Sequence, residues 1–261
     1  MPLFDVLGYE WCLAMAVVAS LGGAHVASVR VGRERRERAP SAVTAAEARP
    51  GATVARLWWQ ATLRLWAALA LPLAAILANA ARVRNCDVRA GIAWFVMLPM
   101  LSAAMGCAAG VVAGLLRVWR GRLAPTALAL GIVVASVAWG VWRFYAAPPI
   151  FGYDPFVGYF AGTLYDEDVA VGSAFVWARL YHAAALAAAL GLCARQLDGR
   201  TLALAWPWST RRHATPSRGR LTVLALVFVV AATALWCGRA RLGFVLGASD
   251  IAARLGAERR T

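Results

Sequence analysis

Arg179 and His182 are the residues of this sequence with the clearest potential for chemistry. Both fall in a long apolar stretch, residues 172–192, and their spacing of three positions puts them on one face of a helix. An ionisable side chain in apolar surroundings is costly, so it marks either a functional site or a structural ion pair. Two interpretations stay open: a solute or proton site, or a tether in which Arg179 pairs with Glu10 or with the acidic run at residues 166–168. We expect the tether.

Arg64 is a third charged residue inside an apolar stretch, residues 57–81. It lies about 10 Å along a helix from Leu57. A long arginine side chain can span that distance while its charged head stays in water or among lipid headgroups. We therefore expect Arg64 to extend toward the nearer membrane surface.

The segment 143–171 is rich in Phe and Tyr, is interrupted by Pro and Gly, and contains the acidic run. Disordered segments are depleted in aromatic residues, and a spanning helix does not carry Pro and Gly every few positions. We predict a structured cap whose rings lie against the mouth of the bundle or against the outer lipid headgroups. It either offers a surface to a ligand or partner, or only seals the bundle. The candidate partner or ligand residues are Phe151, Tyr153, Phe156, Tyr159, Phe160, Tyr165, Asp166, Glu167 and Asp168.

Motifs of several membrane enzymes are absent from the sequence. It contains no HExxH, no GxSG within an apolar stretch, no EExxxR and no GxxxxGK[ST], and its 3 histidines have no nearby carboxylate in sequence. The 5 cysteines show no CxxC pattern. We therefore expect no catalytic residue, no metal and no cofactor. A disulfide from Cys86 to Cys12 or Cys237 stays open.

The composition shows that these residues belong to a membrane protein. Of the 261 residues, 61% are hydrophobic and 15% are charged, against ~25% charged residues in soluble domains. All 27 basic residues are Arg, and the net charge is +14. In a soluble protein such a charge would suggest nucleic acid, but with this hydrophobicity it indicates loops beside an anionic lipid surface. The composition excludes a soluble enzyme and predicts a lipid bilayer, not nucleic acid, as the partner.

Six stretches are long and apolar enough to cross a bilayer core of ~30 Å as helices. We place them at about residues 11–29, 57–81, 91–116, 125–142, 172–192 and 221–237. The predicted fold is all-α: a polytopic integral membrane protein with a six-helix transmembrane bundle over residues 1–238, followed by a tail at residues 239–261.

Arginines crowd one set of the connections between these spans. Sixteen lie in segments 30–56, 117–122 and 195–220, against four in the other connections when the C-terminal tail is left aside. The positive-inside rule puts the arginine-rich segments in the cytoplasm of a bacterial cell. Both termini and the aromatic loop are then extracytoplasmic, and the tail is a stem or an interfacial segment. Tryptophans near predicted span ends, such as Trp58 and Trp94, fit this map as headgroup anchors.

Small residues recur at every fourth position of the third predicted span: Ser102, Gly106, Gly110 and Gly114. Such a ridge lets helix backbones approach closely in lipid, where burial of apolar surface does not drive helices together. We expect the ridge to pack inside one compact bundle. A homodimer through Gly106, Gly110 and Gly114 is the alternative.

Three features of the chain carry a family resemblance. They are the loop PPIFGYDPFVGYFAGTLYDEDVAV, the preceding stretch NCDVRAGIAWF and the outward C-terminal segment. Together they resemble the membrane-embedded N-terminal regions of bacterial proteins that continue into an extracytoplasmic metallopeptidase-like domain. The resemblance implies an anchor role. The zinc-binding HExxH of the peptidase is missing from this sequence, so no activity carries over.

The sequence favours a non-enzymatic membrane anchor or scaffold that presents the aromatic and acidic loop to an extracytoplasmic partner. The alternative is a small transporter or permease component with an outer-facing polar site at Arg179 and His182. A water-filled cavity that reaches these two residues would favour transport, and a filled bundle interior would favour the anchor.

Overall fold

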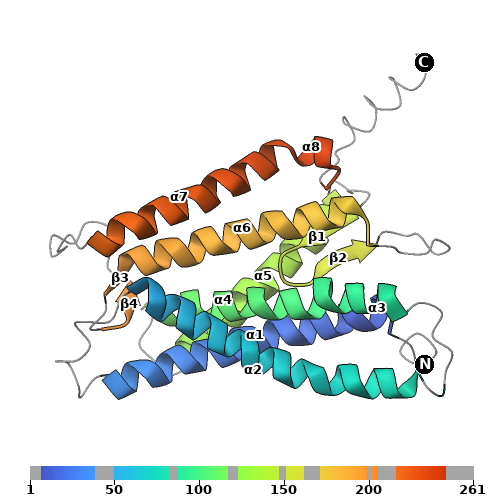
Figure 1. Cartoon of the computed structure of the whole chain (residues 1–261), viewed down its shortest axis with the longest axis horizontal. Helices are drawn as coiled ribbons and strands as arrows, with labels where there is room; N and C mark the ends of the chain where they lie inside the picture. The colour runs from blue at the N-terminus through green and yellow to red at the C-terminus, as the bar shows by residue number, and fades with distance from the viewer. Residues whose placement is uncertain are drawn as a thin grey trace, which may run out of the picture.

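The chain folds as a bundle of long helices with a small β-hairpin at one end (Figure 1). The structure is a computed structural model that describes residues 7–38, 50–80, 82, 88–116, 123–146, 151–161, 171–198, 201–204 and 216–244. Within them, 6 helices are long and apolar enough to cross a membrane. The predicted all-α bundle with six spans is therefore confirmed.

The elements follow one another in this order: α1 Tyr9–Arg38, α2 Pro50–Asn79, α3 Val88–Phe95, η3 Val96–Met100, α4 Leu101–Leu115, α5 Ala124–Ala146, β1 Phe151–Asp154, β2 Gly158–Ala161, α6 Ser173–Gln196, β3 Leu197–Asp198, β4 Ala203–Leu204, α7 Pro216–Cys237 and α8 Arg239–Leu242. Several helices are longer than the predicted spans. The spans are predicted from apolar stretches, and helical turns made of polar residues are not part of such stretches. The start of α2 at Pro50 is an example, since proline suits the first turn of a helix.

The first and third spans run parallel to each other. Gly91 near the start of α3 lies against Leu7, just before α1, and near the other end Arg35 of α1 donates a hydrogen bond of 2.8 Å to the carbonyl of Gly114 in α4. We call the end of the bundle that holds the starts of α1 and α3 the hairpin end, because β1 and β2 lie there (Figure 1). The opposite end, with Arg35, is the arginine end.

The small-residue ridge of α4 packs against α1 within the chain. A Cβ at Gly106 would collide with the backbone of Ser20, and one at Gly110 would collide with the carbonyl of Ala24. The expected bundle packing is therefore correct. Within the chain, α1 occupies the face of Gly106, Gly110 and Gly114 on which the alternative, a homodimer, would rest.

A π-helical turn, η3, interrupts the third span. Pro99 lies in this turn and has no N–H to contribute to a helical hydrogen bond. The wider turn changes which backbone groups are paired, and side chains of other helices supply partners. Trp66 of α2 donates its indole N–H to the carbonyl of Met100 at 2.9 Å, and Trp58 donates to the carbonyl of Ala104 at 2.9 Å. Trp58 thus joins two helices, a role beyond the predicted headgroup anchor.

Two helices lie at the edge of the bundle and expose apolar side chains. On α7, Val223, Leu226 and Val230 are each more than half exposed, and Val134 and Trp139 are similarly exposed on α5. Such surfaces would be unfavourable in water and are suited to lipid. The exposed faces therefore agree with a multi-pass membrane protein.

The contact between α1 and α4 leads to the first prediction. The variant Gly106→Ala should lower the free energy of unfolding by about 1–3 kcal/mol, because the added methyl group overpacks the interface with Ser20. Gly131→Ala is the matched control, since a Cβ at Gly131 in α5 would meet nothing within 4 Å. Thermal unfolding of both purified variants in detergent measures the difference. Equal midpoints would show that α1 and α4 do not pack as described.

Candidate functional site

Arg179 of α6 is almost fully buried, with 2% of its surface exposed, and its guanidinium joins three segments of the chain. Its Nε donates to the carbonyl of Met97 in η3 at 2.9 Å, and one terminal nitrogen donates to Ser102 Oγ in α4 at 3.0 Å. The other terminal nitrogen donates to the carbonyls of Pro155 at 3.0 Å and Asp154 at 3.4 Å. Each nitrogen of the guanidinium is therefore already bonded inside the protein.

Asp154 organises the turn that Arg179 contacts. β1 and β2 pair in antiparallel register, with Asp154 opposite Gly158. One carboxylate oxygen of Asp154 accepts the backbone N–H groups of Phe156 and Val157, both at 2.8 Å, and the other accepts the hydroxyl of Ser136 at 2.6 Å. Asp154 thus pairs the N–H groups of the turn while Arg179 pairs its carbonyls. The two buried opposite charges also attract each other without a direct ion pair.

Gly158 lets the turn approach the arginine. Its φ of +103° lies in a region that residues with a side chain rarely adopt. A Cβ there would also collide with the guanidinium of Arg179 and with Leu98. Both the backbone conformation and the available space therefore require glycine at this position.

The hairpin, residues 151–161, enters the bundle rather than lying on top of it. Ser136, the partner of Asp154, is about 15 Å along α5 from its C-terminal end. Phe156 belongs to a core cluster with Met105, Ala109 and Val133. Non-helical backbone at membrane depth is tolerated only where protein groups satisfy its hydrogen bonds. Asp154 and Arg179 provide that satisfaction, so the segment is a re-entrant hairpin.

Aromatic rings join the segments around the re-entrant hairpin. Tyr153 of β1 stacks on Phe175 of α6 with ring centroids 6.0 Å apart, and Phe175 packs against Trp94 at 5.4 Å. Trp94 in turn meets the edge of Tyr9 at 5.1 Å. Trp94 is 3% exposed, so its predicted role as a headgroup anchor is wrong. Its ring lies inside the bundle, where it links α1, α3 and α6.

Arg179 is held by bonds inside the protein, and the partners that the structure describes do not include Glu10; pairing with residues 166–168 stays a prediction. Glu10 is exposed, and residues 166–168 lie outside the described residues. Arg179 instead bonds to backbone carbonyls and a serine. The reason is that carbonyls of a turn and of a π-helical segment need donors once they leave water.

His182 and Arg64, the other intramembrane polar candidates, do not join this hydrogen-bonded cluster. His182 is on α6 beside Tyr181, and its buried Nδ1 has no hydrogen-bond partner among the residues that the structure describes. Arg64 is exposed on α2, as expected for a side chain that extends toward a surface. It lines a cavity beside Arg30.

The candidate partner or ligand residues of the loop lie in different environments. The side chain of Phe156 is buried in the core, so it is not available to a partner and its assignment to a binding surface is wrong. Tyr153 is half-buried against Phe175. Phe151, Tyr159 and Phe160 lie in the two strands. The remaining candidates lie outside the described residues: Tyr165, Asp166, Glu167 and Asp168.

Asp154 is the residue of this site that the sequence reasoning missed. The run Asp154-Pro155-Phe156-Val157-Gly158 has a turn signature, with an acidic residue first, proline second and glycine last. Aspartate in that position commonly bonds to the N–H groups that follow it. That signature could have identified the turn, although not its position inside the bundle.

Among the described residues, the cysteines and the acidic residues form neither a disulfide nor a metal site. Cys12 is a buried free thiol and Cys237 an exposed one, while Cys86 lies outside the described residues. In the described part of the chain neither Cys12 nor Cys237 is in a disulfide. In the described part of the chain no group of three or more His, Cys, Asp or Glu could hold a metal ion.

Comparisons with known proteins add no relative to this description. No family model matches the chain, and no curated protein and no solved structure matches it either.

The contacts of Arg179 lead to the second prediction. Arg179→Gln should lower the free energy of unfolding by about 3–5 kcal/mol, because it removes the donors of several buried carbonyls and the positive charge that attracts the buried Asp154 carboxylate. Arg179→Lys should lose much of the same stability, since one ammonium cannot reach acceptors on three segments. The measurement is thermal unfolding in detergent. Arg241→Gln, an exposed arginine of α8, is the control and should change stability by less than about 0.5 kcal/mol. If both Arg179 variants unfolded at the same temperature as the wild type, the structural role of Arg179 would be contradicted.

Proposed function

We propose that this chain is a non-enzymatic membrane anchor or scaffold that presents an extracytoplasmic loop to a partner protein. The observation that carries the proposal is the hydrogen bonding of Arg179 to the re-entrant hairpin. A loop that contains such a hairpin has its middle fixed to α4, α5 and α6. The segments before and after the strands are then held at one end each. They lose less conformational entropy when a partner binds, so binding costs less free energy.

The geometry of Arg179 weighs against the alternative, a small transporter or permease component with a polar site at Arg179 and His182. A transport site needs donors that are free to take a solute and a path by which water reaches them. Each nitrogen of the Arg179 guanidinium already donates to the protein. The buried Nδ1 of His182 is the one feature that favours this alternative.

The anchor proposal includes the bacterial inner membrane and an orientation with the hairpin end outside. It rests on the positive-inside rule, and the resemblance to anchors of metallopeptidase-like domains points the same way. In that orientation the arginine end faces the cytoplasm, and both termini are extracytoplasmic.

Labelling of single cysteines tests this orientation and forms the third prediction. Leu123 and Tyr145 flank the two ends of α5 and are 80% and 81% exposed, so they form a matched pair. In a chain otherwise free of cysteine, a membrane-impermeant maleimide should label Tyr145→Cys in intact cells. It should label Leu123→Cys only after the membrane is opened. The reverse labelling pattern would show that the orientation is the opposite one and that the hairpin end faces the cytoplasm.

Photocrosslinking tests the scaffold role and forms the fourth prediction. A benzophenone amino acid in place of Tyr165 should give one discrete protein adduct in cells. The same probe at Val230, on the exposed face of α7, should give adducts only with lipid. Adding Arg179→Gln should reduce the Tyr165 adduct strongly, because the loop loses its fixed base, whereas Arg241→Gln should leave it unchanged.

Two outcomes would contradict the scaffold proposal. One is a Tyr165 adduct whose yield does not respond to Arg179→Gln. The other is a solute flux through proteoliposomes that Arg179→Gln abolishes while the variant unfolds at the wild-type temperature. The second result would favour the transporter.

A further inference from the structure

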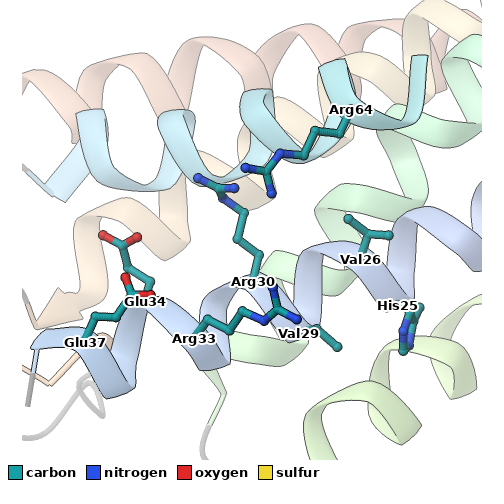
Figure 2. A pocket seen from close by; sticks show the side chains of 8 residues that line it. All are labelled: His25, Val26, Val29, Arg30, Arg33, Glu34, Glu37 and Arg64. Atoms are coloured by element: carbon teal, nitrogen blue, oxygen red, sulfur yellow. The ribbon is translucent and has the colours of Figure 1, made fainter. Parts of the chain in front are cut away.

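A cavity of about 450 Å³ lies between α1 and α2 at the arginine end (Figure 2). The re-entrant hairpin lies at the opposite end of the bundle (Figure 1). Its apolar part is formed by Val26 and Val29. Its polar part is mostly cationic and is made by His25, Arg30, Arg33, Arg64, Glu34 and Glu37. Three arginines against two glutamates leave the lining net positive.

The two helices bring these residues together by an antiparallel register. Glu34 of α1 forms an ion pair with Arg56 of α2, and Arg30 donates a hydrogen bond to Gln60 one turn further along. The same register places Arg64 one turn beyond Gln60. Arg64 therefore lies closer to the membrane centre than Arg30 does. Figure 2 shows the side chain of Arg64 extending back toward Arg30, with the two guanidinium groups turned toward each other.

The charges of Arg30 and Arg64 are only partly compensated within the described residues. Glu34 and Glu37 attract Arg30, but Arg56 and Arg64 repel it. Glu34 pairs with Arg56, and the partner of Arg30 is the neutral amide of Gln60. The Nε of Arg30 is buried and has no hydrogen-bond partner in the described part of the chain. No ion pair joins Arg64 to a carboxylate in that part of the chain either, and Arg30 is a like charge close to it. Two facing guanidinium groups beside an apolar wall repel each other unless an anion lies between them.

We propose that this cavity binds the phosphate group of an anionic membrane lipid. Guanidinium groups recognise phosphate through paired, charge-assisted hydrogen bonds. The lipid is favoured over a soluble phosphate because the cavity combines cations with Val26 and Val29. On the same helix as Arg64, Trp59 and Leu63 are also 44% and 43% exposed, so α2 offers an apolar surface. The acyl chains of the lipid would lie along that exposed face. This site is independent of the proposed scaffold role, since it shares no residue with the hairpin.

Native mass spectrometry and thermal unfolding of the purified full chain test the proposal, which is the fifth prediction. Phosphatidylglycerol should remain bound and raise the unfolding temperature, whereas phosphatidylcholine, whose headgroup carries no net charge, should do so far less. The variant Arg30→Gln with Arg64→Gln should weaken phosphatidylglycerol binding by about tenfold or more, as expected from the loss of two charge-assisted contacts. Arg64→Gln alone, at an exposed position that folding does not require, should weaken it by a smaller factor.

Arg195→Gln is the matched control, because Arg195 is an exposed arginine near the end of α6 that does not line the cavity. It should leave phosphatidylglycerol binding within about twofold of the wild type, since a non-specific surface charge contributes little. Three results would overturn the proposal. They are equal binding of the two lipids, equal weakening by Arg195→Gln and Arg64→Gln, or binding of inorganic phosphate with no binding of phosphatidylglycerol.

Discussion

The structure depends on one constraint: backbone polar groups that leave water inside a membrane protein need partners from the protein. The re-entrant hairpin and η3 both place irregular backbone inside the bundle. Arg179 bonds to carbonyls of both, and Asp154 bonds to the N–H groups of the turn. Either residue alone would be a buried charge with a high desolvation cost. Together they complete the hydrogen bonds of the turn and balance each other's charge.

The same constraint explains how the rest of the bundle is arranged. In lipid, burial of apolar side chains does not drive helices together, so α1 and α4 associate through close van der Waals contact. The ridge of small residues on α4 allows the two backbones to come that close. Trp58 and Trp66 then join α2 to the third span by donating to its carbonyls. The helices with the most exposed apolar surface, α5 and α7, lie at the edge, where lipid replaces protein as the neighbour.

The sequence allowed a good prediction of the helices and of their packing, because span length and small-residue spacing depend directly on residue type. It also allowed the prediction that Arg179 is a tether. It did not reveal which groups accept the hydrogen bonds of Arg179. Most of them are backbone carbonyls, which every residue has, so residue types do not identify them. Asp154 was missed although it opens a recognisable turn, because turn signatures are usually found on surfaces. The cavity at Arg30 and Arg64 required knowledge of the register between α1 and α2, which separate apolar windows do not contain.

The position of Arg179 in the chain has a consequence for how the protein is made. Synthesis runs from the N-terminus, so residues 151–161 leave the ribosome before α6 does. Until α6 has been made, the turn carbonyls of Asp154 and Pro155 have no guanidinium to bond with, and burying them without a donor costs free energy. The bonds that hold the hairpin inside the bundle therefore depend on a residue that is synthesised after it, so they cannot form while the hairpin itself is being made.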